Sequence, residues 1–235
     1  MKFHLSIICL TIICYTHIRA QDVSVMNYLQ QAGIYAEIYN GKREIVYNPS
    51  QYENLPYYMN PDFTEASVIY KKNYYPKQKV RLDLFKEQLV ILSPEKQYGI
   101  ILNPQHVEKV QMYNKTFVWL APPKESGLKT GYYIQLLEGG KMQLFCKENY
   151  SSEQRIQDRV TVNYFSRKVR YYLSYNNRYH TVKDKGSFSK LFPQYKMQIN
   201  SFVQDNQLNF KQNTEKSLTS LAGYCEGLIN STNNE

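Results

Sequence analysis

The first chemistry that the residue types of this chain could support is the binding of a metal ion. Outside the first twenty residues only two histidines occur, His106 and His180. Neither has a second His or Cys at the short spacing of a zinc site, and "HVEKV" at His106 lacks the second histidine of a metalloprotease helix. We therefore expect both histidines to lie on strand surfaces, and the sequence predicts no metal site and no cofactor.

Nucleophilic catalysis would need an activated serine or cysteine. The chain has no Gly-x-Ser-x-Gly motif, and Ser126 lies in "KESGLK", outside the strand-turn-helix setting that exposes a catalytic serine. Cys146 lies in a strand-like run without a neighbouring histidine. These observations predict no catalytic nucleophile.

Carboxylates are the remaining candidates for catalysis. Asp83 with Glu87, or Glu37 with Glu44, could serve as an acid and base pair. The chain has 20 acidic residues, however, and such pairs then arise by chance. The sequence predicts no catalytic residue, and a hydrolytic enzyme that uses carboxylates stays an alternative.

The most conspicuous charged pair is Arg81 and Asp83. Both lie in "KVRLDLFKEQLVIL" (Lys79–Leu92), which alternates like a β-strand and turns at Lys86-Glu87-Gln88. Residues two apart in a strand share a face, so the pair can hold this strand in register. Because nothing nearby in sequence gives Asp83 a catalytic partner, we interpret Arg81 and Asp83 as a structural pair.

Tyrosine is the unusual component of the composition, with 23 Tyr against one Trp. Tyrosine suits half-buried sheet positions and binding surfaces, because its ring packs while its hydroxyl stays hydrated. Tyr pairs in strands place one ring on each face of a sheet. We therefore take Trp119, Tyr132 and Tyr171 as a candidate binding surface.

The middle of the chain predicts a series of antiparallel hairpins. Asn40-Gly41, Gly139-Gly140, Asn176-Asn177 and Ser93-Pro94 each separate two strand-like segments rich in β-branched and aromatic residues. "APPKESGLKTG" (residues 121–131) is expected to be a loop. Short strands without intervening helices favour an antiparallel meander that forms a curved sheet, a sandwich or an open barrel.

The hydrophobic period changes near Lys185 to that of helices. Pro193 can begin a second helical segment, and Thr214 can cap a final helix with Glu215 in its first turn. One apolar stripe follows, formed by Leu218, Leu221, Ala222, Cys225, Leu228 and Ile229. We expect residues 186–230 to be helices that pack on the sheet, which makes the fold mainly β with C-terminal helices, of the α+β class.

Residues 1–20 have the pattern of a secretory signal peptide, with an apolar run at Phe3–Tyr15 and cleavage near Ala20. We expect one β-rich domain over residues 21–235, exported to the periplasm or the outside, without a membrane span. The net charge of +9 falls to +7 when Lys2 and Arg19 leave, and export argues against nucleic acid as a partner. Cys146 and Cys225 remain, and their apolar neighbours favour buried free thiols.

Three segments together resemble a known family. "LDLFKEQLVIL", with the flanking residue Arg81, "GYYIQLLEGGKMQLFCK" and the C-terminal "LFPQYKMQINSFVQDNQLNFKQNTEKSLTSLAGYCEGL" are similar to uncharacterised exported β-rich proteins common in Bacteroidota. The resemblance implies export and a single β-rich domain with C-terminal helices. It implies no activity and no catalytic residues.

The function that these features favour is that of a non-catalytic cell-envelope or extracellular protein. Its tyrosine-rich sheet would bind a protein, a glycan or an apolar ligand. The alternatives are the carboxylate hydrolase and a structural component of an envelope assembly.

Overall fold

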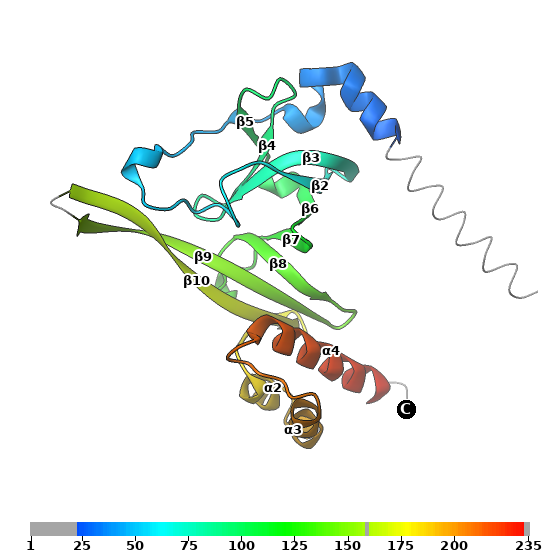
Figure 1. The fold of residues 1–235 in the computed structure, drawn as a ribbon. Helices are drawn as coiled ribbons and strands as arrows, with labels where there is room; N and C mark the ends of the chain where they lie inside the picture. The colour runs from blue at the N-terminus through cyan, green and yellow to red at the C-terminus, as the bar shows by residue number, and fades with distance from the viewer. Residues whose placement is uncertain (1–22, 158–159, 233–235) are drawn as a thin grey trace, which may run out of the picture. The chain divides into compact units, whose positions relative to one another are not determined.

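The computed structural model describes residues 23–157 and 160–232 (Figure 1). The expected signal peptide, residues 1–20, lies outside this part of the chain. The chain divides into two compact units, the first formed by residues up to Asn48 and by Leu55–Asn114, the second by Pro49–Asn54 and the residues from Lys115 onward. The prediction of one domain over residues 21–235 stays a prediction.

The first unit is an antiparallel sheet with the strand order β1-β5-β4-β3-β2-β6. Its strands are β1 (Lys42–Arg43), β2 (Thr64–Tyr70), β3 (Asn73–Asp83), β4 (Gln88–Leu92), β5 (Gly99–Ile101) and β6 (Val107–Met112). Residues 23–32 are helical, and short 3₁₀ helices follow at η1 (Gly33–Tyr35), η2 (Glu37–Tyr39) and η4 (Pro104–His106).

The hairpin predicted at Asn40-Gly41 is wrong. The residues before it form η2, and β1 after it pairs with β5 instead. A Cβ on Gly41 would lie 2.2 Å from the carbonyl oxygen of Ile101, so this glycine permits a close approach of two backbones rather than a tight turn. The hairpin predicted at Ser93-Pro94 is confirmed, because it joins β4 to β5.

The second unit is an antiparallel sheet with the order β7-β8-β9-β10-β11. Its strands are β7 (Lys115–Leu120), β8 (Gly131–Glu138), β9 (Met142–Gln157), β10 (Val160–Tyr175) and β11 (Arg178–Val182). The predicted turns are confirmed here. Gly139-Gly140 joins β8 to β9, and Asn176 and Asn177 join β10 to β11 with φ of 50° and 58°.

Strands β9 and β10 form a long hairpin arm that extends beyond its neighbours (Figure 1). Strand β8 pairs with β9 only over residues 143–146, and β11 pairs with β10 only over residues 171–175. The 3₁₀ segment η3 (Pro49–Gln51) and the residues after it brace the outer edge of β10. There, Asn54 exchanges two hydrogen bonds with the backbone of Phe165.

Helices cover one face of the second sheet, as predicted. They are α2 (Lys185–Leu191), α3 (Lys196–Asp205) and α4 (Thr214–Thr232), with η6 (Pro193–Tyr195) between the first two. Asp184 caps α2 by accepting a hydrogen bond from the backbone N–H of Ser187. All residues of the predicted stripe except Leu228 pack with Leu144 and Leu173 of the sheet in one buried cluster.

The predicted fold class is therefore confirmed: mainly antiparallel β with C-terminal helices, of the α+β class. None of the helices in the described ranges is long and apolar enough to cross a membrane.

The two cysteines of the described chain are buried free thiols, as expected. Cys146 lies on β9 and Cys225 on α4, and burial raises the pKa of each thiol to about 12. Because the thiolate is the reactive form, neither side chain has the character of a nucleophile in the folded protein.

This burial predicts a simple labelling result. In protein that begins at Gln21, iodoacetamide at pH 8 should modify Cys146 and Cys225 at least about 100-fold more slowly before unfolding than after it, because both thiols are buried and their pKa is raised. Mass spectrometry of the alkylated peptides measures both rates. Fast labelling of Cys146 in the folded protein would contradict its assignment as a core thiol.

Candidate functional site

A small basic pocket lies on the second sheet, on the face opposite the helices. Its volume is about 230 Å³. Strands β8, β9 and β10 and the loop before β8 supply its lining, which consists of Gly127, Lys129, Tyr133, Lys147, Asn149, Tyr150, Ser151, Lys168, Arg170 and Tyr172. Four of these ten residues, all in the described part of the chain, are cationic and none is acidic.

The register of β9 and β10 brings the cations together. Lys147 lies directly opposite Arg170, and Asn149 lies opposite Lys168. Side chains that face each other across an antiparallel pair are about 5 Å apart at Cβ, and like charges in that position repel. The hairpin thus carries an excess of positive charge on this face.

Lys147 forms the floor of the pocket and is only 1% exposed. Its Nζ donates a hydrogen bond to the carbonyl oxygen of Tyr132 at 2.9 Å and lies 4.9 Å from the centroid of the Tyr133 ring. Burying an ammonium group is costly unless its surroundings compensate the charge. The carbonyl and the ring interact favourably with the ammonium group and hold it in one position.

On the opposite face of the same hairpin, a cation is paired with a carboxylate. Arg167 donates two hydrogen bonds to the Glu148 carboxylate, at 2.7 and 2.6 Å. These bonds raise the pKa of the Arg167 guanidinium, which stays charged. Positive charge is therefore matched by a carboxylate on the helix-covered face and concentrated on the pocket face.

The loop 121–131 forms one wall of the pocket, and its prediction as a loop is confirmed with a short 3₁₀ turn, η5 (Lys124–Ser126). Gly127 ends this turn with φ of 69°, in the left-handed region. Leu128 packs on a cluster that includes Tyr133 and Tyr172. The Tyr133 hydroxyl donates to the carbonyl oxygen of Lys129 at 2.6 Å, which fixes the loop and the lysine beside the sheet.

The residues predicted as a binding surface lie on the other face. Trp119 and Tyr132 are cross-strand partners with ring centroids 5.0 Å apart, and Tyr171 packs against the helical cluster. Burial raises the pKa of Tyr171 to about 12. The pocket is lined instead by Tyr133 and Tyr172, the other member of each tyrosine pair.

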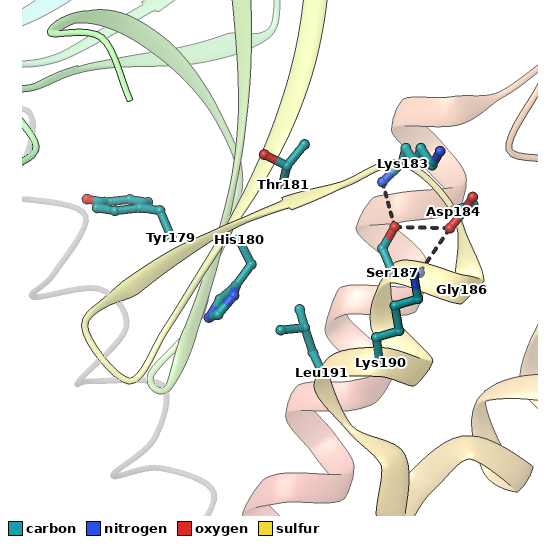
Figure 2. A pocket seen from close by; sticks show the side chains of 9 residues that line it. All are labelled: Tyr179, His180, Thr181, Lys183, Asp184, Gly186, Ser187, Lys190 and Leu191. Atoms are coloured by element: carbon teal, nitrogen blue, oxygen red, sulfur yellow. Dashed lines mark hydrogen bonds between the residues drawn. The ribbon is translucent and has the colours of Figure 1, made fainter. Parts of the chain in front are cut away.

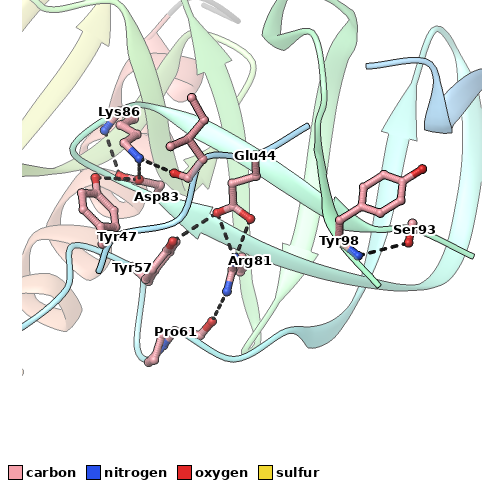
Figure 3. Close-up of polar contacts among 10 residues, drawn as sticks. Glu44, Tyr47, Tyr57, Pro61, Arg81, Asp83, Lys86, Ser93 and Tyr98 are labelled. Carbon is pink, nitrogen blue, oxygen red and sulfur yellow. Dashed lines mark hydrogen bonds and ion pairs between the residues drawn. The ribbon is translucent and has the colours of Figure 1, made fainter. Parts of the chain in front are cut away.

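Arg81 and Asp83 belong to a buried polar network of the first unit, shown in Figure 3, but each has its own partner. Arg81 forms an ion pair with Glu44, with its Nη2 at 2.5 Å from Oε2 and its Nε at 3.1 Å from Oε1. The Tyr57 hydroxyl also donates to Glu44, and the Arg81 guanidinium lies over the rings of Tyr57 and Phe63.

Asp83 clasps the turn between β3 and β4 (Figure 3). Its Oδ1 accepts hydrogen bonds from the backbone N–H groups of Phe85 and Lys86, at 2.9 and 2.8 Å. Its Oδ2 accepts from the Tyr47 hydroxyl at 2.8 Å. The carboxylate is 1% exposed, and burial raises its pKa although these bonds act in the other direction.

The other carboxylates considered for catalysis are dispersed. Glu37 forms an ion pair with Lys71, and Glu87 lies in the turn after Asp83 with φ of 54°. Within residues 23–157 and 160–232, no group of three or more His, Cys, Asp and Glu side chains is placed to hold a metal ion.

A second, wider pocket of about 790 Å³ lies between β11 and α2 (Figure 2). His180, Lys183 and Lys190 line it with Asp184 and Ser187, which bond to each other as the cap of α2. The expectation that the histidines lie on strand surfaces holds for His180, on β11, and is wrong for His106, which ends η4. Because the carboxylate of this pocket, Asp184, already accepts the hydrogen bonds that cap α2, the basic pocket is the stronger candidate for a functional site.

Comparison with known proteins adds no further guidance, because no family model, curated protein or solved structure matches this chain.

The sequence could not have identified the basic pocket directly. Its four cations are scattered over residues 129–170, and they meet only through strand register. One local signal was present: in "SRKVRYY", Lys168, Arg170 and Tyr172 alternate on one strand face.

The role of Asp83 can be tested by substitution. Asp83→Ala removes the acceptor of two backbone N–H groups and should lower the free energy of unfolding at pH 7 by about 2–4 kcal/mol. Asp83→Asn keeps an oxygen for both and should cost less. The raised folded pKa of Asp83 adds a separate, pH-dependent part to the stability. This part is fully present below the unfolded pKa of about 4 and is lost as the pH rises through the folded pKa. Asp83→Asn should remove this pH dependence.

Urea unfolding of both variants between pH 4 and 7 measures these effects. Glu95→Ala, in the exposed turn after β4, is the control and should change stability by less than about 0.5 kcal/mol. If Asp83→Ala were as stable as the unsubstituted protein at pH 7, the hydrogen bonds from Asp83 to the turn would not stabilise the fold.

Proposed function

We propose that this protein is an exported, non-catalytic binding protein that holds an anionic ligand in the basic pocket. The observation that carries the proposal is the convergence of four cations, one of them buried, in a pocket whose lining contains no acid among the described residues. Phosphate, sulfate and carboxylate groups are the anions that Lys and Arg recognise in such a site.

An anion in this pocket would reduce the repulsion between cations that the pairing of β9 with β10 brings together. Lys147 and Arg170 face each other across the hairpin, with Lys168 two residues farther along β10. A ligand oxygen between them would replace repulsion with charge-assisted hydrogen bonds. Lys147 is already held by the Tyr132 carbonyl, so little side-chain freedom would be lost on binding.

The size of the pocket limits the bound group. About 230 Å³ is below the range of pockets that enclose drug-sized ligands, so the pocket would hold one charged group with a single ring attached. The rings of Tyr133 and Tyr172 form its apolar side.

The hydrolase alternative is less well supported by the arrangement of the carboxylates. Glu44 is bonded to Arg81 and Tyr57, and Asp83 to the turn that it clasps. Neither lines one of the pockets described above. Export, and a place in the cell envelope or outside it, rests on residues 1–20 and is part of the proposal.

Calorimetric titration of the chain from Gln21 onward tests the proposal. We expect inorganic sulfate, inorganic phosphate or glucuronate to bind, with affinity that falls as salt rises, and glucose not to bind. Arg170→Gln and Lys168→Gln should each weaken binding about tenfold or more, because each removes a charge-assisted hydrogen bond.

Lys211→Gln is the matched control, since it removes the same charge from an exposed position of the second unit away from the pocket. It should leave the affinity within about twofold. Equal losses in Lys211→Gln and Arg170→Gln would show a nonspecific charge effect, and no binding of any anion would refute the proposal.

A further inference from the structure

The pocket continues onto the outer half of the β9–β10 arm. Its lining already runs along β9 from Lys147 to Ser151. Four residues of a strand span about 13 Å, which is longer than one charged group needs. The residues along the arm therefore indicate what is attached to that charged group.

These residues form a polar track, which we define as Asn149, Ser151, Ser166 and Lys168; of these, only Ser166 is not in the pocket lining. The register places Ser151 opposite Ser166 and Asn149 opposite Lys168, so all four side chains share the pocket face. The two serine hydroxyls lie 2.8 Å apart and share a hydrogen bond. Each oxygen keeps acceptor capacity for a ligand hydroxyl, and the Asn149 amide offers both donors and an acceptor.

The track ends at a carboxylate. Glu153 accepts hydrogen bonds from the hydroxyls of Ser166 and Tyr164. These bonds lower the pKa of Glu153, so the carboxylate is ionised at neutral pH. Along β9 the face thus changes from positive at Lys147, through the Asn149 amide and the Ser151 hydroxyl, to negative at Glu153, about 20 Å from Lys147. Arg155, the next residue of β9 on this face, forms an ion pair with Glu53.

From this order of charges we infer that the ligand is an acidic oligosaccharide. Its charged sugar occupies the pocket, and neutral sugars follow the polar track toward Ser151 and Ser166. The inference rests on the proposed function and adds the class and the direction of the ligand. Sugars match the track because their hydroxyl groups can donate to the serine oxygens and can both donate to and accept from the Asn149 amide.

Other anionic ligands fit this face less well. A nucleic acid or a uniformly charged polymer would bring a negative charge to every unit, including the one nearest Glu153. An anionic lipid would need an apolar path beside the pocket, whereas the track consists of Asn, Ser and Lys side chains.

The test compares ligands of equal length and different charge by calorimetry. The probe is aldotetraouronic acid, which carries one 4-O-methylglucuronate on xylotriose. We expect it to bind about tenfold or more tightly than glucuronate alone, through added hydrogen bonds. Tetragalacturonate should bind more weakly than the probe, and neutral xylotetraose should not bind measurably. An oligothymidylate of eight nucleotides and phosphatidylglycerol vesicles represent the nucleic acid and the lipid.

Variants of the track separate length from charge. Ser166→Ala should weaken binding of the probe and leave glucuronate binding unchanged, because Ser166 is not among the residues that line the pocket. Ser152→Ala is the matched control, because this serine of β9 points to the other face of the arm. Glu153→Gln should strengthen binding of tetragalacturonate more than binding of the probe, since it removes the repulsion at the end of the track.

The two proposals fail in different ways. If glucuronate binds at the pocket but the probe binds no more tightly, or if Ser152→Ala acts like Ser166→Ala, the oligosaccharide assignment is wrong and the anion site stands. Tighter binding of the oligothymidylate or of the vesicles would also overturn it. If no anion binds, both proposals fail.

Discussion

The pairing register of β9 with β10 is the constraint on which the rest of the second unit depends. Sixteen consecutive pairs join the two strands, from Met142 with Tyr175 to Gln157 with Val160. A shift of one residue in either strand would move every side chain of that strand to the opposite face. Lys147 would then face the helical cluster, and Leu144 would be exposed to solvent. The apolar residues beneath the helices therefore determine where the cations lie.

The helices enforce this register from one side. Leu144 and Leu173 are cross-strand partners, and both are buried in the cluster with Leu221 and Cys225 of α4. Burial of such side chains stabilises by about 1.5–3 kcal/mol each, more than the repulsion of one half-exposed pair of like charges. The hydrophobic face can thus hold Lys147 opposite Arg170 at a tolerable cost, and the arm can keep a face whose residues suit binding better than stability.

The sequence predicted the parts of this structure that local chemistry controls. The turns Gly139-Gly140 and Asn176-Asn177 and the stripe of α4 were identified because each signal lies within a few residues. Asn40-Gly41 was misleading, since the same dipeptide serves a close backbone approach, and Ile101 lies sixty residues away. The sequence also shows that adjacent tyrosines in a strand point to opposite faces of the sheet. Only the position of the helices shows which ring of each pair is covered.

The basic pocket could not be predicted because it depends on contacts distant in sequence. Lys129 reaches it through the loop that Tyr133 and Leu128 hold, and Lys147 and Arg170 meet through 16-residue strands. In the sequence these cations look like ordinary solvated charges. Similarly, Arg81 and Asp83 were expected to act together, and the partner of Arg81, Glu44, became visible only in the folded chain.

The polar network around Arg81 and Asp83 and the basic pocket differ in how their charges are balanced. This difference supports the proposal that the basic pocket binds a ligand. In the first unit, Glu44 meets Arg81, and Asp83 meets two N–H groups, Tyr47 and Lys86. Acids and donors are matched within the fold, as in a network that stabilises one structure. In the second unit, the lining of the pocket has four cations and, among the described residues, no acid. The ligand that we propose would bring negative charge to this pocket from outside the chain.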